Sequence, residues 1–206
     1  MIAIVDYGVG NLFSITRAFE SLGADIEVTG DASHIAQASA IVLPGVGAFG
    51  DAADKLSECG LDAVLCEQAA AGKPLIGICL GMQLLFEESY EYGVHKGLGL
   101  IPGKVTSMRE RVSSELKIPQ IGWNALQKTN NKSSLLKYVD DGEYVYFVHS
   151  FSAVDCDDFV TSTCDYGGII TASVERENVM GCQFHPEKSG DVGMKILRRF
   201  LEMVGE

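Results

Sequence analysis

The stretch Leu75-Ile76-Gly77-Ile78-Cys79-Leu80-Gly81 runs from an apolar segment straight into the start of a helix. Its first part, Leu75–Ile78, is short and uncharged, which predicts a strand buried on both faces. The helix is expected over Leu80–Glu87. A buried strand that passes directly into a helix is typical of a parallel sheet with helices on both faces.

The same alternation precedes this stretch. Apolar residues recur at helical spacing from Leu12 to Leu22, where Gly23 ends the pattern, and a longer helical segment over Ala52–Ala71 is interrupted at Gly60. Short apolar strands are expected before and between these helices, at Ile2–Val5, Ile26–Val28 and Ile41–Leu43. This order predicts an α/β, flavodoxin-like fold in which helices flank a mostly parallel sheet.

The second half of the chain is predicted to be rich in strands. Tyr144–Val148 is apolar throughout, which predicts a strand buried on both faces. A last helix is expected over Asp191–Met203. Since no repeat or linker interrupts the pattern, residues 1–206 are expected to form a single domain. Turn residues separate the segments of an expected strand meander, Phe159–Cys164, Ile169–Val174 and Val179–Phe184.

Composition excludes several classes of protein. Hydrophobic residues make up 47% and charged residues 21%, as in globular proteins. The formal net charge of -12 argues against nucleic acid or an anionic membrane as the main partner. The apolar run at the N-terminus is too short for a signal peptide, and the six cysteines form no CxxC pair and no zinc spacing with the four histidines. We therefore expect a cytoplasmic protein with reduced thiols and no metal.

Cys79 lies where hydrolases with a nucleophile elbow place their serine, between a strand and a helix. Gly77 and Gly81 allow the backbone to turn sharply around it. The N-terminus of the following helix favours the thiolate, which is the reacting species. A buried cysteine that only packs at this junction is the structural alternative, and Cys79 by itself does not decide between the two.

The segment Gln183-Phe184-His185-Pro186-Glu187 favours the catalytic interpretation. It follows a strand with an imidazole and a carboxylate, at the edge of a parallel sheet where catalytic groups gather. His185 is expected to take the thiol proton of Cys79 and to protonate the leaving amine, while Glu187 orients the imidazole. A solvent-facing histidine and a surface carboxylate are the alternatives for each residue alone.

A glycine-rich loop, Pro44-Gly45-Val46-Gly47, follows the third expected strand. The backbone at Val46 and Gly47, with the amide of Leu80, is a candidate for an oxyanion hole. The run Gly45–Gly50 also matches G-x-G-x-x-G, the fingerprint of dinucleotide-binding proteins. That fingerprint belongs after the first strand of a βαβ unit, with an acidic residue at the end of the next strand, so we expect no cofactor.

Together these motifs resemble those of the class I glutamine amidotransferases, which use a Cys-His-Glu triad. Within that family, the likeness is greatest to the glutaminase subunits of imidazole glycerol phosphate synthase. Many class I glutaminases share the elbow and the His-Pro-Glu segment. The segments that point to this subunit are Asp6-Tyr7-Gly8-Val9-Gly10-Asn11, Gly122-Trp123-Asn124 and Glu187-Lys188-Ser189. Further matching segments are 44–50, 77–86, 97–101 and 146–150.

The resemblance implies a glutamyl thioester on Cys79 and L-glutamine as the substrate. It also implies which groups hold the glutamine, namely the side chains of Gln83 and Glu91 and the backbone at Gly47, Ser150 and Phe151. Solvated helix and loop positions are the alternative for Gln83 and Glu91. Phe151 stands where the family pattern more often has tyrosine.

The resemblance further implies a heterodimer with a (β/α)8-barrel cyclase that receives the ammonia through a channel, in histidine biosynthesis. The cyclase would face Asn11, Trp123, Tyr146 and Lys188. The alternatives are that Trp123 and Tyr146 are core aromatic residues and that Lys188 is a surface charge without a role. Gln120 replaces a histidine of the family pattern, which puts only the detail of the docking surface in doubt. Three other functions stay open: the same chemistry with another acceptor, a non-catalytic flavodoxin-like module, and a Cys-His peptidase.

Overall fold

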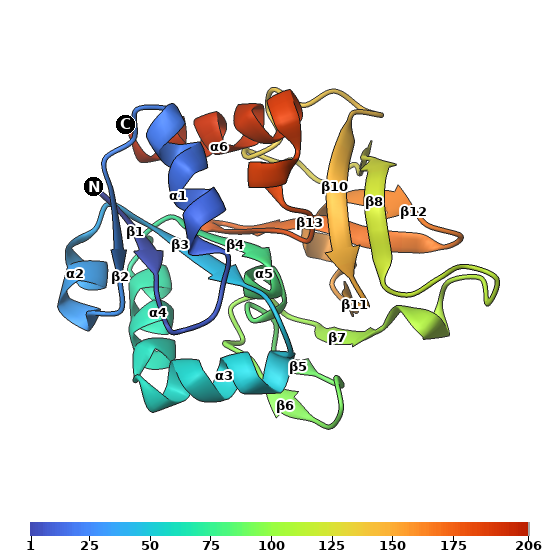
Figure 1. The fold of residues 1–206 in the computed structure, drawn as a ribbon, viewed down its shortest axis with the longest axis horizontal. Coiled ribbons are helices and arrows are strands. Elements are labelled where there is room, and N and C mark those ends of the chain that lie inside the picture. Colours follow the sequence, from blue (N-terminus) through green and yellow to red (C-terminus); the bar gives the residue numbers. More distant parts are fainter. Residues whose placement is uncertain (206) are drawn as a thin grey trace.

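The computed structural model describes residues 1–205, and at its centre is an eight-stranded sheet with the order β2-β1-β3-β4-β14-β13-β12-β9 (Figure 1). The first five strands in this order are parallel to one another. The other three extend the sheet in antiparallel fashion. The architecture confirms the predicted α/β fold with a mostly parallel sheet between helices.

The first half follows the predicted alternation of strands and helices. A short helix, α2, is not predicted from the sequence, because Ile35 is its only buried residue. Gly60, with φ 68°, separates α3 from α4 as predicted. The elements are β1 (Ile2–Val5), α1 (Leu12–Ser21), β2 (Ile26–Thr29), α2 (Ala32–Gln37), β3 (Ala40–Gly45), α3 (Phe49–Glu58), α4 (Leu61–Ala70), β4 (Leu75–Cys79) and α5 (Leu80–Gln83).

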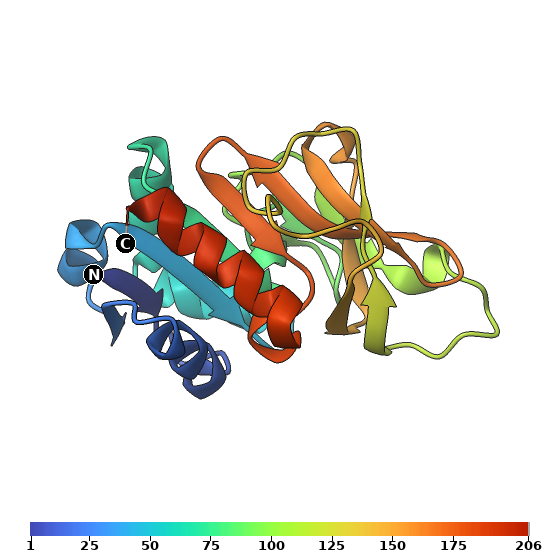
Figure 2. The ribbon, with the colours of Figure 1, turned by 90° about the horizontal axis from the view of Figure 1, so that it is seen from above.

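Alternate residues of the parallel strands face two different hydrophobic layers. In β1, Ile2 and Ile4 pack with α1 and with α6 (Gly190–Val204), whereas Ala3 and Val5 pack with α2, α3 and α4. All four side chains are completely buried, since a parallel strand inside the sheet is covered on both faces. Figure 2 shows α1 and α6 along one face of this sheet and α4 behind it.

The helix after Cys79 is shorter than predicted. It ends at Gln83, not at Glu87. The carbonyl groups of Leu84, Leu85 and Phe86 accept hydrogen bonds from the backbone of residues 98–101 instead of from a next helical turn. This pairing is long-range, and a local apolar pattern therefore overestimates the helix.

The second half contains the predicted meander and two smaller sheets. The meander strands are antiparallel to one another, and β14 joins them to β4 of the parallel half. The smaller sheets have the orders β11-β7-β5-β6 and β10-β8. The strands are β5 (Glu88–Ser89), β6 (His95–Lys96), β7 (Lys104–Ser107), β8 (Gln120–Ala125), β9 (Gln127–Lys128), β10 (Tyr144–His149), β11 (Phe151–Val154), β12 (Val160–Asp165), β13 (Ile169–Arg176) and β14 (Val179–Cys182).

The prediction that Tyr144–Val148 is buried on both faces is wrong. This segment belongs to β10, which pairs with β8 in a two-stranded antiparallel sheet. Val145 and Phe147 are completely buried, whereas Tyr144 and Tyr146 on the other face are partly exposed. The exposed face carries aromatic residues, so the apolar run in the sequence conceals a strand with one open face.

The last helix, α6, has the predicted amphipathic pattern. Ile196, Leu197 and Phe200 are completely buried, and Phe200 packs edge-on against Phe19 of α1. Within residues 1–205, no helix combines the length and the apolar character that a membrane crossing requires.

Candidate active site

Cys79 lies at a sharp turn between β4 and α5. Its φ of 56° and ψ of −112° are unusual for a residue with a side chain. A Cβ atom added to Gly81 would lie 1.9 Å from the carbonyl oxygen of Leu43, and one added to Gly77 would lie 2.5 Å from that of Gly81. Only glycine therefore allows the turn to pack this closely against β3, and the strained turn projects the thiol from the end of the sheet.

His185 and Glu187 lie on a short 3-10 turn, η3 (Pro186–Lys188), just after β14. His185 Nδ1 is 2.8 Å from Oε1 of Glu187, whose side chain is completely buried. His185 Nε2 is also buried and has no hydrogen-bond partner within residues 1–205. Since a carboxylate only accepts, Nδ1 carries the proton, and the lone pair of Nε2 is free to act as a base.

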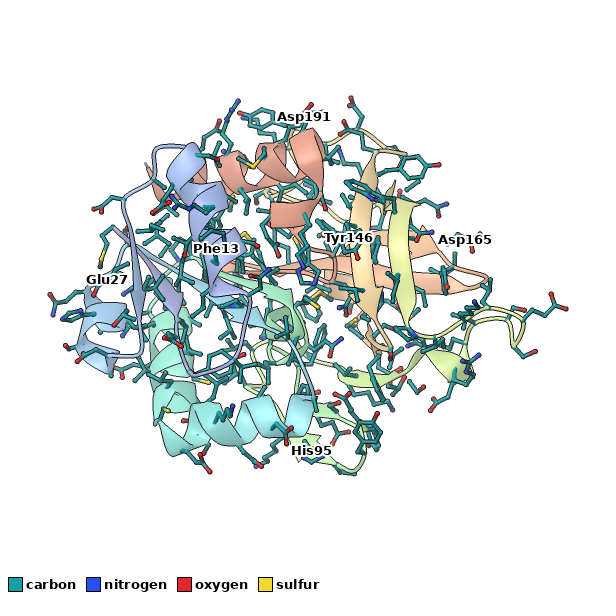
Figure 3. All side chains as sticks on the ribbon, viewed as in Figure 1. Phe13, Glu27, His95, Tyr146, Asp165 and Asp191 are labelled. Atoms are coloured by element: carbon teal, nitrogen blue, oxygen red, sulfur yellow. The ribbon has the colours of Figure 1, made fainter. Side chains whose placement is uncertain are left out.

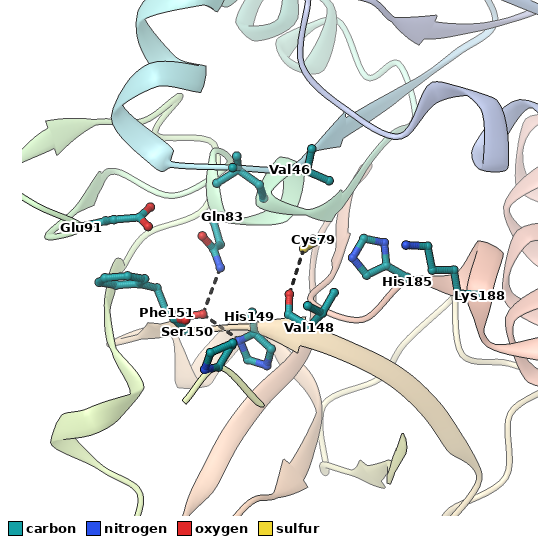
Figure 4. A pocket seen from close by; sticks show the side chains of 13 residues that line it. Val46, Cys79, Gln83, Glu91, Val148, His149, Ser150, Phe151, His185 and Lys188 are labelled. Atoms are coloured by element: carbon teal, nitrogen blue, oxygen red, sulfur yellow. Dashed lines mark hydrogen bonds between the residues drawn. The ribbon is translucent and has the colours of Figure 1, made fainter. Parts of the chain in front are cut away.

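Figure 4 shows the imidazole of His185 beside the sulfur of Cys79, on one wall of the cavity. Burial lowers the pKa of His185, but the neighbouring Cys79 and Glu187 outweigh burial and raise it to about 9. With a pKa above neutral, Nε2 of His185 binds a proton readily, and the carboxylate of Glu187 balances the charge of the resulting imidazolium. Such a pair can supply a nucleophile, once the thiol of Cys79 has given its proton to Nε2, and a proton donor for a leaving group.

A cavity of about 330 Å³ opens in front of Cys79. It brings together all the residues that the sequence suggests for catalysis and for substrate binding, with one exception. The exception is Glu187, which lies behind His185. Pro119, Val148 and His149 also line it and are not predicted from the sequence as site residues. The predicted residues on its wall are Cys79, His185, Val46, Gly47, Leu80, Gln83, Glu91, Ser150, Phe151 and Lys188.

The loop between β3 and α3 forms one wall of this cavity. Gly47 has φ 97°, a conformation that favours glycine, and Val46 is 41% exposed. The hydroxyl group of the buried Tyr7 donates a hydrogen bond to the carbonyl oxygen of Pro44 at 2.8 Å and holds the start of the loop. Its end is held by Glu91, whose Oε2 accepts from the backbone N–H of Phe49 at 2.7 Å. Glu91 thus joins the cavity to the loop.

His149 supports the opposite wall. Its Nδ1 donates to the carbonyl oxygen of Phe151 at 2.8 Å, and burial lowers its pKa to about 4, so the ring is neutral at pH 7. Its Nε2 lies 3.0 Å from Oε1 of Gln120, whose amide group donates to Oδ1 of Asn124 at 2.8 Å. In the sequence, the only sign of this supporting role is that His149 directly precedes Ser150, a residue suggested for substrate binding.

Gln120 is completely buried and contacts His149 and Asn124. The side chain of Gln120 therefore does not itself form part of an outer surface. It sits behind the pocket wall, because alternate residues of β8 point to opposite sides of the strand and Gln120 points inward. Its exposed neighbour Ile121 points outward.

The residues suggested for a partner interface lie outside the cavity, apart from Lys188. Trp123 is 51% exposed and packs edge-on against Tyr146, its direct neighbour across β8 and β10, with ring centroids 6.0 Å apart. Asn11 is partly buried and caps α1, accepting from Ser14 N. Figure 3 shows Phe13 on α1 and Tyr146 on β10 on the side that faces the viewer. Phe13 is 72% exposed and is not singled out by the sequence.

Within residues 1–205, no group of three or more His, Cys, Asp or Glu side chains could hold a metal ion. The six cysteines are free thiols.

Comparison with known proteins decides the family. The model of the family described as glutamine amidotransferase class-I matches residues 3–204. This chain belongs to the class I glutamine amidotransferase family. The predicted family resemblance is thereby confirmed.

Curated relatives of this class I glutamine amidotransferase are named imidazole glycerol phosphate synthase subunit HisH. The protein of Wolinella succinogenes is 46% identical over 205 residues, which cover 98% of this chain and 100% of the relative. That of Exiguobacterium sibiricum is 48% identical over 202 residues, covering 98% and 95%. These matches confirm the predicted likeness to that subunit.

Solved structures show the same fold. One is described as PurLQS from Thermotoga maritima, and the matched chain is 23% identical with a TM-score of 0.75, covering 98% of this chain and 97% of that one. At this identity, the likeness supports the fold of the amidotransferase and no finer assignment.

Proposed function

We infer that this chain is the glutaminase subunit of an imidazole glycerol phosphate synthase. The observation that carries the inference is the position of His185 beside the strained Cys79: its Nδ1 is held by Glu187, and its buried Nε2 has no hydrogen-bond partner among the described residues 1–205. The substrate class follows from the family and from the curated subunits that match the whole length of the chain. Its substrate is L-glutamine, and residues 1–206 act as one glutaminase domain.

The first half of the reaction uses Cys79 as the nucleophile. His185 Nε2 takes the thiol proton, and the thiolate attacks the δ-carbonyl carbon of glutamine, giving a tetrahedral oxyanion. The C–N bond then breaks as the imidazolium gives its proton to the leaving nitrogen, which departs as ammonia. A glutamyl thioester remains on Cys79. Glu187 stabilises the imidazolium during both proton transfers.

The second half is hydrolysis of the thioester. His185 takes a proton from water, the hydroxide oxygen attacks the thioester carbonyl, and the C–S bond breaks to release glutamate and regenerate Cys79. The balance is glutamine plus water to glutamate plus ammonia. The developing oxyanion is stabilised by backbone N–H groups of the Val46–Gly47 loop and of Leu80 at the N-terminus of α5.

The remaining substrate contacts come from the cavity walls. The side chains of Gln83 and Glu91 and the backbone at Gly47, Ser150 and Phe151 bind the α-amino and carboxylate ends of glutamine. All five residues line the same cavity, which supports this assignment. The carboxylate of Glu91 suits an ammonium group by charge.

The partner in this proposal is a (β/α)8-barrel cyclase that accepts ammonia through a channel in the cytoplasm. Ammonia released into neutral water is mostly protonated and loses its nucleophilicity, so direct transfer preserves its reactivity. Trp123, Tyr146, Asn11 and Lys188 form the docking surface, supported by the partial exposure of the Trp123–Tyr146 pair. Exposed aromatic side chains are common anchors of protein interfaces.

The test is glutamate release from glutamine with and without a histidine-pathway cyclase and its nucleotide ligand. Wild type is expected to turn over in the complex, and Cys79→Ala to lose at least about 10⁵-fold. Cys66→Ala, which changes a half-buried thiol in α4, serves as the matched control and retains activity. A wild type that stays silent with the cyclase, but whose Cys79 is alkylated by diazo-oxo-norleucine, would keep the chemistry and reject the acceptor.

A further inference from the structure

Gln183 lies behind the cavity wall, between two residues of the site. It is completely buried just after β14, and its backbone N–H donates to the carbonyl oxygen of Ala172 at 2.9 Å. Its side-chain Nε2 donates to Sγ of Cys79 at 3.9 Å. Its Oε1 accepts from Nε2 of Gln83 at 2.9 Å. One buried amide therefore touches both the nucleophile and a residue of the substrate cavity.

The direction of these hydrogen bonds is determined by the carbonyl oxygen of Phe151, which can only accept. Gln83 Nε2 donates to it at 3.0 Å, so the amino end of Gln83 faces Phe151. The second N–H of Gln83 then points to Gln183, which must present its oxygen there. The amino end of Gln183 is left facing Cys79. Turning the Gln83 amide over would place its oxygen against the oxygens of Phe151 and Gln183, and turning the Gln183 amide over would place its N–H groups against those of Gln83. Either change costs hydrogen bonds.

This chain of hydrogen bonds also decides what Gln83 offers to the cavity. Both N–H groups of its amide are used, and its Oε1 has no partner within residues 1–205. Figure 4 shows this oxygen on the side that faces Glu91. An acceptor oxygen beside a carboxylate suits the ammonium end of an amino acid.

At the other end of the chain, the N–H of Gln183 points at the sulfur of Cys79. A donor to the charged form of a group favours that form, and a buried donor does so more strongly than one in water. The cavity does not include Gln183 in its lining, so the residue acts on substrate only through its neighbours.

We propose that Gln183 is a positioning residue of the glutaminase, whose N–H stabilises the thiolate of Cys79 while its oxygen orients the amide of Gln83. The proposal rests on the proposed function. It predicts that Gln183 affects two separable quantities, the ease of thiolate formation and the affinity for glutamine.

Two variants separate these quantities. Gln183→Glu keeps an oxygen toward Gln83 but sets a second oxygen against the sulfur. Gln183→Met removes both the donor and the acceptor. For each, the pH dependence of Cys79 alkylation by iodoacetamide is measured by mass spectrometry, and KM and kcat for glutamine are measured in the complex with the cyclase.

Both variants are expected to move the midpoint of alkylation up by about one pH unit or more and to lower kcat about 10- to 100-fold, since each loses a hydrogen bond to a charged group. Gln183→Met is expected to raise KM about tenfold as well, while Gln183→Glu keeps KM within about threefold. Since glutamate has the shape of glutamine, Gln183→Glu carries the test if Gln183→Met does not fold.

The matched control is Cys182→Ala, a completely buried neighbour that ends β14. It is expected to lower stability but to keep the alkylation midpoint and KM of wild type. If wild-type Cys79 is labelled by diazo-oxo-norleucine and both Gln183 variants match wild type in midpoint and KM, the positioning role is overturned and the glutaminase stands. If wild type is neither labelled nor active in the complex, the proposed function itself fails.

Discussion

Cys79 lies in the parallel half of the main sheet, whereas His185 follows β14, the strand at which the antiparallel half begins. β14 is parallel to β4 on one side and antiparallel to β13 on the other. The carboxyl ends of β4 and β14 are therefore neighbours, which brings together two residues more than a hundred positions apart in the sequence.

The two halves prepare their residues in different ways. The backbone shape around Cys79 positions its side chain. The turn has no room for a Cβ atom at positions 77 and 81, and both are glycine. Around His185, the orienting groups come from contacts between segments. Its backbone N–H donates to Tyr146 at 2.9 Å, and its carbonyl oxygen accepts from Ser189 Oγ at 2.6 Å. The parallel half thus depends on backbone shape, and the second half on hydrogen bonds.

Among the variants that compare the two halves, the largest effect is expected where the hydrogen bonds of the second half are changed. Glu187→Gln preserves the shape of the side chain but removes the charge that stabilises the imidazolium. We expect kcat for glutamine hydrolysis in the complex to fall about 10²- to 10⁴-fold with the fold retained by circular dichroism.

The matched control is Glu177→Gln, in the exposed turn between β13 and β14. It removes the same charge far from His185 and is expected to leave kcat unchanged. Equal activity of wild type and Glu187→Gln would show that Glu187 does not assist the base.

The next effect tests the backbone shape of the parallel half. Gly81→Ala is expected to lower the free energy of unfolding by about 3 kcal/mol or more, because its Cβ would overlap the carbonyl of Leu43. Urea unfolding measures the loss. Gly99→Ala adds a Cβ to open space at φ 65° and is expected to cost only about 1–2 kcal/mol. Similar losses at both positions would mean that the elbow has room for a side chain.

A smaller effect is expected on the outer face of the second half. Trp123→Ala is expected to weaken binding to the cyclase about 10- to 100-fold, because an exposed aromatic anchor is lost. Titration calorimetry gives the Kd, and alkylation of Cys79 in the isolated chain is expected to stay as in wild type.

Ile169→Ala is the control for this prediction. Ile169 is 60% exposed at the start of β13 and belongs to no suggested interface. An unchanged Kd for Trp123→Ala would remove the Trp123–Tyr146 pair from the docking surface.

The smallest expected effect is a change of thermal stability with pH. It depends on both halves, because Cys79 and Glu187 both raise the pKa of His185. The pKa of His185 in the folded chain is about 9, above its usual value of 6.5. Protonation of His185 therefore stabilises the folded state. This contribution to the free energy of unfolding is fully present below pH 6.5 and is lost as the pH rises through 9. The melting temperature of wild type relative to Glu187→Gln is expected to fall by about 2–4 °C between pH 6.5 and 9.5. A difference that does not change with pH would mean that Glu187 does not raise the pKa of His185.

Much of the first half could be predicted from local patterns, and less of the second. The strands around Ile4 and Ile76 follow from short apolar runs, because central parallel strands are buried on both faces. Tyr144–Val148 shows the same kind of run but has one open face, since the side chains of Tyr144 and Tyr146 are not buried. The helix predicted up to Glu87 ends at Gln83 because residues 98–101 take the backbone bonds.

The candidate site shows a similar division. Cys79, His185 and Glu187 stand out in the sequence because each lies in a short motif with a mechanism. His149 and Gln183 are not predicted as site residues, because their roles arise from hydrogen bonds to the backbone of Phe151 and to the side chain of Gln83, which the sequence pattern does not show.

By itself, the sequence determined the class of fold and the family likeness, and it predicted the reacting groups. Each of these depends on local patterns, such as apolar periodicity or a glycine-flanked cysteine. Only the tertiary structure decided which nitrogen of His185 is free, which way the amides of Gln83 and Gln183 point, and that Gln120 faces inward. The physical reason is that hydrogen-bond direction and burial depend on partners far away in the chain, which local sequence does not specify.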